Sequence, residues 1–273
     1  MMKRRLRAPF FWLKSLSLVE VCVPTRIAIY PLLMANRFST IAGEIHVLSP
    51  NESFAELARR LNALAAQGES SVGLSGGSTP KAFYAWAVAH QALSPASLKN
   101  LHWHVSDERC VPLASDDSNF GHAERGLLNP LKVPAHCRFP WPVYLPPPEA
   151  AAAYERAWQE RSPRKTFDLC VLGLGDDSHI ASLWPQCPWI GKKIDARFVA
   201  TEWPGRGWRL TITELGLSQC ASIVVLVNGK AKARALQSII QDEYNPSLHP
   251  GQILRAYAPN VTWLVDAEAA SLL

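Results

Sequence analysis

The chain has 273 residues, of which 48% are hydrophobic, so it is long enough to bury a sizeable core. Its formal net charge of +5 is modest and much of it lies in the first few residues, which does not favour a nucleic-acid partner. The six cysteines include no C-x-x-C pair, and several lie in apolar runs, which predicts reduced core thiols in a cytoplasmic protein. No apolar run approaches the roughly 20 residues that a membrane span requires, so we expect no membrane association.

Residues 1–36 differ in pattern from the rest of the chain. They begin with basic residues and continue as an apolar stretch that Lys14, Glu20 and Arg26 interrupt. We expect them to be an extension outside the fold, with Met34 as a plausible start of the protein. Residues 37–273 are expected to form a single α/β domain.

Short apolar runs alternate with amphipathic segments after residue 37. Strands are predicted at 45–48, 71–75, 101–106, 167–172, 198–201, 209–213, 223–227 and 261–265. Helices are predicted at 51–67, with Asn51 or Ser53 as its cap, at 80–90, begun by Pro80, and at 120–128, 149–161, 229–241 and 267–272. This alternation predicts a Rossmann-like, mostly parallel sheet with helices on both faces.

The stretch 167–185 combines a buried strand with a turn that carries polar side chains. Gly173 and Gly175 let the backbone leave the strand sharply. Asp177 or Ser178 is expected to cap a short helix, with His179 in its first turn. Ligands of open parallel sheets bind at the carboxyl ends of the strands, so His179 is a candidate general base. The positive end of the helix dipole is expected to favour its neutral form.

The segment SGGSTP at 75–80 has the pattern of a phosphate-binding loop between a strand and a helix. Gly76 and Gly77 allow close approach of the backbone, Ser78 and Thr79 offer hydroxyls, and the helix N-terminus offers free N–H groups. Spacing alone leaves an ordinary tight turn equally acceptable.

Two other motifs overlap these loops. The sequence G-x-S-x-G at 73–77 is similar to a hydrolase nucleophile turn with Ser75 as nucleophile, but the helix expected from Pro80 begins too late for that geometry. The sequence G-x-G-x-x-S at 173–178 lacks the third glycine of a dinucleotide fingerprint. We therefore favour neither a serine hydrolase nor a dinucleotide site.

Charged residues also follow other strands. Asp107 and Arg109 lie at the end of a predicted strand, where an arginine can bind a phosphate or carboxylate through two hydrogen bonds, although a surface ion pair is the alternative. Lys232 lies in the first turn of a predicted helix, where a cation is unfavourable unless an anion binds nearby. The histidines show no metal-ligand spacing, so no metal site is expected.

Together these motifs resemble those of the 6-phosphogluconolactonase family, which shares its fold with sugar-phosphate isomerases and glucosamine-6-phosphate deaminase. The resemblance runs from about Phe38 to the C-terminus. It rests on SGGSTP (75–80), SDERCVPLASDDSNFG (106–121), GLGDDSHIASLWP (173–185), RLTIT (209–213), G-x-x-K (229–232) and VTWLVD (261–266). The deaminases follow the histidine turn with A-F-N-E-P, whereas residues 181–185 resemble the lactonase version.

One residue departs from the family pattern. Ser178 stands where the family usually has glycine before the histidine. If this position has a positive φ, serine there costs on the order of 1 kcal/mol. If the glycine instead contacts substrate, Ser178 is expected to crowd the site and slow turnover.

The resemblance implies hydrolysis of 6-phospho-D-glucono-1,5-lactone in the oxidative pentose phosphate pathway, without a metal or organic cofactor. His179 would be the general base, oriented by Asp177, and Arg109 or backbone N–H groups of 173–178 would stabilise the oxyanion. The expected substrate-binding residues are Gly76, Gly77, Ser78, Thr79, Asp107, Asn119, Arg209 and Lys232, with Asn119 on a sugar hydroxyl. The alternatives are an isomerase or deaminase of the same fold and a non-catalytic sugar-phosphate-binding protein. We expect a monomer or weak homo-oligomer.

Overall fold

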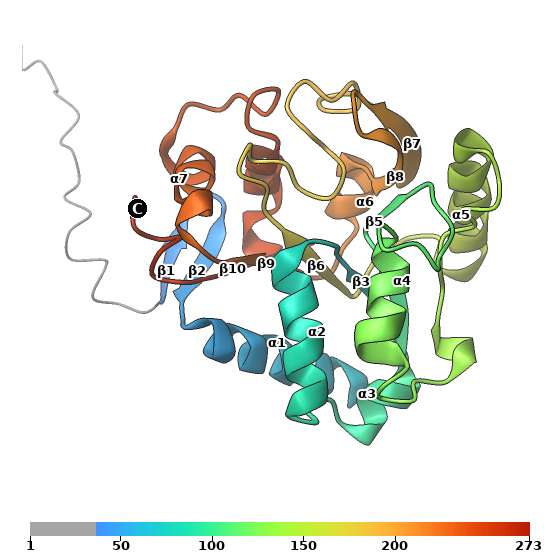
Figure 1. Cartoon of the computed structure of the whole chain (residues 1–273). Helices are drawn as coiled ribbons and strands as arrows, with labels where there is room; N and C mark the ends of the chain where they lie inside the picture. The colour runs from blue at the N-terminus through green and yellow to red at the C-terminus, as the bar shows by residue number, and fades with distance from the viewer. Residues whose placement is uncertain (1–36) are drawn as a thin grey trace, which may run out of the picture.

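The computed structural model describes residues 37–273, so the expectation for residues 1–36 lies outside the described part (Figure 1). A seven-stranded sheet forms its centre, in the order β1-β2-β10-β9-β6-β3-β4. Its strands are β1 (Arg37–Thr40), β2 (Gly43–Val47), β3 (Ser70–Leu74), β4 (Leu101–Val105), β6 (Leu169–Gly173), β9 (Ile223–Val227) and β10 (Val261–Val265). All neighbouring pairs are parallel except β1 and β2, which confirms the mostly parallel sheet.

A second, three-stranded sheet is antiparallel and has the order β5-β8-β7. It consists of β5 (Asp107–Arg109), β7 (Phe198–Trp203) and β8 (Gly207–Ile212). Asp107 and Arg109 follow β4 and line a cleft, as expected from the sequence, but they form a strand of their own, which was not predicted. The chain leaves the large sheet after β4, and these residues pair with β8 instead. The small sheet therefore brings its own side chains to the edge of the large one.

Helices flank the large sheet. They are α1 (Pro50–Ala65), α2 (Ser78–Ala89), α3 (Pro95–Asn100), α4 (Asn119–Ala123), α5 (Pro147–Arg161), α6 (Glu214–Ser218) and α7 (Ala233–Gln241), with a π-helical turn at Glu124–Leu128 and 3₁₀ segments at Ala135–Cys137, Lys230–Lys232 and Pro250–Asn260. In Figure 1, α1, α2 and α3 lie below the row of strands, and α6 and α7 lie above it. Within residues 37–273, no helix is long and apolar enough to cross a membrane.

Two helix starts differ from the sequence expectation. The cap of α1 is Ser49, whose hydroxyl accepts from the Glu52 N–H while the Glu52 carboxylate accepts from the Ser49 N–H at 2.8 Å. This reciprocal capping box leaves Ser53 fully buried inside the helix. The second helix, α2, begins at Ser78 rather than at Pro80, because Gly77 at φ +95° turns the chain directly into the helix.

The predicted helix at 267–272 was wrong. Residues 267–272 form only turns, beginning with an Ala269 N–H that donates to the Asp266 carboxylate at 2.7 Å. A run this short forms too few hydrogen bonds to repay the cost of helix nucleation.

A cluster of aromatic rings joins the small sheet to the large one. Tyr154 of α5 stacks on Trp141 at 4.0 Å and meets Phe198 of β7 edge-on at 4.9 Å. Trp158 of the same helix meets Phe167, just before β6, at 5.1 Å. Such pairs stabilise by more than their buried area alone. Because the two sheets share this core, the side chains that they present to one another are held in fixed relative positions.

Candidate active site

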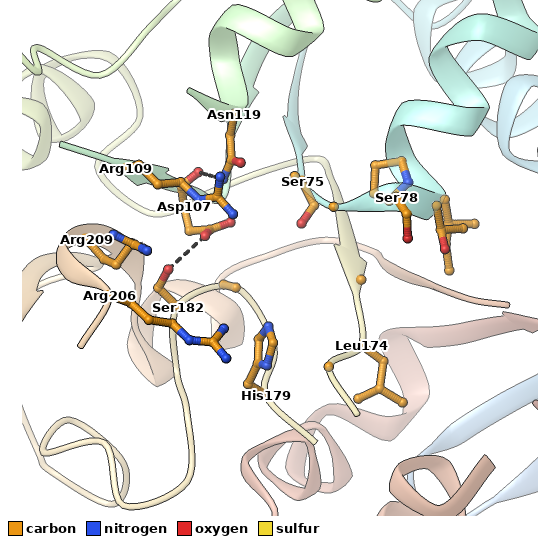
Figure 2. Close-up of a pocket in the computed structure, with 18 of the residues that line it drawn as sticks. Ser75, Ser78, Asp107, Arg109, Asn119, Leu174, His179, Ser182, Arg206 and Arg209 are labelled. Atoms are coloured by element: carbon orange, nitrogen blue, oxygen red, sulfur yellow. Dashed lines mark hydrogen bonds between the residues drawn. The ribbon is translucent and has the colours of Figure 1, made fainter. Parts of the chain in front are cut away.

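A cleft of about 200 Å³ opens at the carboxyl ends of the parallel strands (Figure 2). Ten of the side chains or glycines that the sequence analysis selected line it, namely Gly76, Gly77, Ser78, Thr79, Asp107, Arg109, Asn119, His179, Arg209 and Lys232. The loops after β3, β6 and β9 converge here because parallel strands end at one edge of the sheet. The small sheet supplies Asp107, Arg109 and Arg209 from the side. Asp177 lies behind the lining, bonded to His179.

The 76–79 loop has the shape that its sequence predicted. Gly77 has a positive φ of 95°, and a side chain at Gly76 would collide with Asn119. Ser78 begins the 12-residue helix α2, so free backbone N–H groups point toward the cleft beside its hydroxyl. Packing against Asn119 therefore requires the glycine at 76, and the backbone conformation favours the glycine at 77.

The turn that carries His179 is not helical, contrary to the sequence prediction. Ser178, Ala181 and Gln186 have positive φ values of 71°, 47° and 65°, which a right-handed helix cannot contain. Asp177 does accept the His179 N–H, at 3.0 Å, as a cap would, but it closes an isolated turn. This turn therefore adds no helix dipole at the imidazole.

Asp177 is the group that acts on His179 instead. Its carboxylate oxygen lies 2.6 Å from His179 Nδ1. Burial raises the pKa of the Asp177 carboxyl, but the hydrogen bond and charge of His179 outweigh it and lower the pKa from 3.8 to about 2. Because an ionised carboxylate only accepts hydrogen bonds, Nδ1 must carry the proton. The neutral ring then presents its free lone pair on Nε2.

Glycine 175 allows this arrangement. A side chain at Gly175 would collide with the His179 ring and the Asp177 carboxylate, and its N–H donates to the His179 carbonyl at 2.8 Å. The backbone of this turn therefore wraps directly around the imidazole.

Ser178 has the conformation that favours glycine. Its φ of 71° makes it a strained residue, consistent with a cost of about 1 kcal/mol. Its side chain is buried with Oγ 3.5 Å from Nδ1 of His249, and it does not line the cleft. The expected crowding of the site by Ser178 is therefore wrong, because the side chain points away from the cleft.

The buried carboxylate of Glu108 organises the residues on either side of it. It accepts hydrogen bonds from the N–H groups of Arg109, Asn119 and Phe120 at 2.7 to 2.8 Å, and from Ser118 Oγ at 3.0 Å. Burial raises the pKa of Glu108, and the N–H donors oppose that shift. Glu108 thus fixes the positions of Arg109 and Asn119, which both face the cleft. The D-E-R sequence at 107–109 did not predict this role.

Asn119 and Asp107 form a second fixed pair. Asn119 Nδ2 donates to the Asp107 carbonyl at 2.9 Å, and Ser182 Oγ donates to the Asp107 carboxylate at 2.8 Å (Figure 2). Within residues 37–273, the buried Asn119 Oδ1 has no hydrogen-bond partner. This oxygen faces Gly76, where an added Cβ would collide with it, so it is packed against the 76–79 loop and is not offered to the cleft.

Two arginines lie opposite each other on neighbouring strands of the small sheet. Arg109 of β5 and Arg209 of β8 are register partners, and like charges in such positions repel. Burial and then the charge of Arg109 lower the pKa of Arg209. Among residues 37–273, neither has a carboxylate within ion-pair distance, and their guanidinium groups donate only to backbone carbonyls. An anion between them would remove the repulsion.

Several lining side chains were not selected from the sequence, among them three that are polar or aromatic. Ser182, Trp203 and Arg206 line the cleft, and the last two come from the tip of the β7–β8 hairpin. The only signal for the hairpin is the W-P-G-R-G-W segment at 203–208, between two runs that were each predicted as strands. Its position over the cleft is a tertiary feature that no local pattern specifies.

Other chemistries find less support in the described residues. Ser75 lines the cleft, but within residues 37–273 its hydroxyl has no hydrogen bond to a histidine, so no nucleophile–base pair forms. In the same part of the chain, no group of His, Cys, Asp and Glu side chains is arranged to hold a metal ion. The cysteines at 110, 137, 170, 187 and 220 are free thiols.

The depressed pKa of Asp177 predicts a pH-dependent contribution to stability. Because the folded pKa of about 2 lies below 3.8, the contribution is present above pH 3.8 and is lost as pH falls toward 2. Denaturant unfolding of Asp177→Asn and the wild type at a series of pH values should show a stability difference that shrinks in this window. The exposed neighbour variant Asp176→Asn serves as control. A difference that stays constant down to pH 2 would contradict the assignment.

The Glu108 network predicts a loss of stability in Glu108→Gln. The glutamine amide would direct N–H donors at backbone N–H groups, leaving buried donors unpaired, which costs about 1–3 kcal/mol in the free energy of unfolding. Asp116→Asn, in the same loop with a 99% exposed side chain, should be neutral in the same urea titration. Equal stability of Glu108→Gln and the wild type would show that this carboxylate does not organise the loop.

Comparison with known proteins agrees with this geometry. Residues 51–263 match the family of glucosamine-6-phosphate isomerases/6-phosphogluconolactonase. A 6-phosphogluconolactonase of Synechocystis sp. (strain ATCC 27184 / PCC 6803 / Kazusa) is 33% identical over 221 residues, covering 79% of this chain and 89% of the relative.

Solved structures give the same result. A 6-phosphogluconolactonase from Trypanosoma cruzi superposes with a TM-score of 0.74 at 25% identity, covering 87% of this chain and 98% of that chain. A monomeric glucosamine-6-phosphate deaminase has a TM-score of 0.71 at 18% identity, covering 84% and 99%, which is a likeness of fold alone. The chain therefore belongs to the glucosamine-6-phosphate isomerase/6-phosphogluconolactonase family.

Proposed function

We propose that this protein hydrolyses 6-phospho-D-glucono-1,5-lactone to 6-phospho-D-gluconate, the lactonase step of the oxidative pentose phosphate pathway. The observation that carries the proposal is the Asp177–His179 pair at the edge of a cationic cleft that also contains a phosphate-type loop. The matched Synechocystis and Trypanosoma cruzi proteins are named as this lactonase. Hydrolysis of such a lactone needs an activated water, a stabilised oxyanion and a bound phosphate, and each has a candidate here.

His179 would act as general base through Nε2. Its Nδ1 proton is held by Asp177, so the free lone pair takes the proton of a water molecule that attacks the lactone carbonyl. The imidazolium that forms is stabilised by the adjacent carboxylate and later returns its proton to the ring oxygen. Its side chain is 27% exposed, so water reaches the ring.

The phosphate would bind at the 76–79 loop with Lys232. The N-terminus of α2 and the hydroxyls of Ser78 and Thr79 suit an anion, and Lys232 adds charge from the loop after β9. Binding energy from this distant group would align the carbonyl with the base.

Arg209 was also expected at the phosphate, together with Ser78. Figure 2 shows Arg209 and Ser78 on opposite sides of His179. We therefore place Arg209, with its register partner Arg109, at the carbonyl end of the substrate. Asp107 and Asn119, which both line the cleft, would bind sugar hydroxyls.

Two alternatives on the same fold are less well supported. An isomerase or deaminase would need its own acid–base groups after the histidine, and residues 181–185 carry the lactonase-like A-S-L-W-P instead. Binding of a sugar phosphate without catalysis does not require a histidine that a carboxylate holds in one tautomer. The turn that carries this pair is strained at Ser178, which a binding function alone does not explain.

The partner in this proposal is a small phosphorylated sugar lactone. We place the enzyme in the cytoplasm as a monomer or weak homo-oligomer, without a nucleic-acid partner, on the basis of its reduced cysteines and modest net charge of +5.

Substrate assays separate the three functions. The purified chain should hydrolyse the phosphorylated lactone and should not release ammonia from glucosamine 6-phosphate. Lactone hydrolysis is measured by the release of acid and is corrected for the spontaneous rate. Ammonia release without lactone turnover would identify a deaminase. A thermal shift by 6-phosphogluconate without any turnover would identify a binding protein.

Replacement of the base should abolish most catalysis. His179→Ala is expected to lower kcat by about 100- to 10,000-fold, the usual contribution of a general base, with an unchanged circular dichroism spectrum. His90→Ala, an exposed histidine at the end of α2 and outside the cleft, should retain full activity. Near-normal kcat in His179→Ala would remove this residue from the mechanism.

A further inference from the structure

The tip of the β7–β8 hairpin holds Arg206 in a defined position. Trp203 pairs with Gly207, so the loop between them has only three residues. Gly205 and Gly207 have φ values of 72° and 74°, and the Arg206 N–H donates to the Trp203 carbonyl at 2.9 Å. The backbone of the hairpin therefore fixes the point from which the Arg206 side chain extends.

Arg206 belongs to a three-layer stack. Its guanidinium carbon lies 4.7 Å from the centre of the Trp203 ring, and Trp203 stacks at 4.8 Å on Trp184, which is 7% exposed. A cation over an indole face is attracted by the ring quadrupole. The buried Trp184 thus supports Trp203, and Trp203 supports the guanidinium.

The same indole contacts the proposed base. The His179 ring meets Trp203 edge-on, with ring centres 5.2 Å apart and planes at 80°. Figure 2 shows the guanidinium of Arg206 pointing toward His179, on the side away from Ser78. Among residues 37–273, no carboxylate pairs with Arg206, so its charge is available to a ligand.

We propose that Arg206 stabilises the negative charge that develops on the lactone carbonyl oxygen, and then binds the carboxylate of the product. This rests on the proposed lactonase function. As water attacks the carbonyl carbon, the electron pair of the C=O π bond moves to the oxygen, where a guanidinium N–H can donate to it. Collapse of this intermediate re-forms the C=O bond and breaks the bond to the ring oxygen, which takes the proton from His179. The carboxylic acid that results loses the second proton of the attacking water to solvent, and the charge then lies on the carboxylate.

Arg206 is better suited to this oxyanion than the residue selected from the sequence. Arg109 donates to the Asp117 carbonyl at 2.6 Å, which fixes its direction, and it shares its surroundings with Arg209. The Gly175 and Ser178 N–H groups of the histidine turn are already bonded to backbone carbonyls. Among the arginines of residues 37–273, Arg206 is the one whose guanidinium lies over the indole that contacts the base.

The test compares two ligands that differ only at the reacting end. 6-Phosphogluconate carries the carboxylate, and glucitol 6-phosphate carries the same chain and phosphate with a hydroxymethyl group in its place. By titration calorimetry, Arg206→Ala should weaken 6-phosphogluconate binding by about 10- to 100-fold, the value of a charge-assisted hydrogen bond, and leave glucitol 6-phosphate binding unchanged. Equal weakening of both ligands, or of neither, would overturn the proposal.

Kinetics provide the second measurement. Arg206→Ala should lower kcat for the lactone by roughly 10- to 100-fold, less than a buried oxyanion donor because the guanidinium is exposed. Arg206→Lys should recover part of the loss, and Lys193→Ala, an exposed charge outside the cleft, should match the wild type. A raised KM with unchanged kcat in Arg206→Ala would contradict the oxyanion role. A wild-type enzyme without lactonase activity would instead reject the proposed function itself.

Discussion

The hydrogen bond between Asp177 and His179 is the interaction on which the account of this site depends. It decides which imidazole nitrogen faces the cleft, and it lowers the pKa of Asp177 to about 2 despite partial burial of the carboxyl. The bond exists because the turn after β6 is strained, with Ser178 at φ 71° and a glycine at 175 where any side chain would collide with the ring. The fold thus accepts local backbone strain in this turn, and the strained turn holds the His179 side chain in position.

Two sheets form the site, and each contributes a different kind of group. The large parallel sheet ends in the 76–79 loop and the histidine turn, which are backbone structures fixed by glycines. The small antiparallel sheet supplies long cationic side chains, Arg206 and Arg209, from a hairpin. The aromatic contacts between α5, β7 and the segment before β6 hold the two sheets together. A substrate with an anion at one end and a reacting carbonyl at the other matches this division.

Sequence patterns predicted the parts of this site that short segments determine. The apolar runs at 223–227 and 261–265 form buried strands with those bounds, and loops that follow parallel strands necessarily share one edge of the sheet. The helix predicted with His179 in its first turn was wrong, because Asp177 caps an isolated turn and the positive φ values of Ser178 and Ala181 do not fit a right-handed helix. Arg206 was missed and the organising role of Glu108 was not predicted, because a hairpin that reaches the cleft and a buried carboxylate leave no local periodicity.

The tautomer of His179 tests this account most directly. A long-range proton–nitrogen correlation spectrum of the uniformly ¹⁵N-labelled protein, recorded at a pH where the imidazole is neutral, shows which ring nitrogen carries the proton. The ring signals of His179 are the ones that disappear in the same spectrum of His179→Ala. Because Asp177 accepts from Nδ1, the account predicts a protonated Nδ1 and an unprotonated Nε2. A neutral ring protonated on Nε2 would have no lone pair facing the cleft, and that result would contradict His179 as the base.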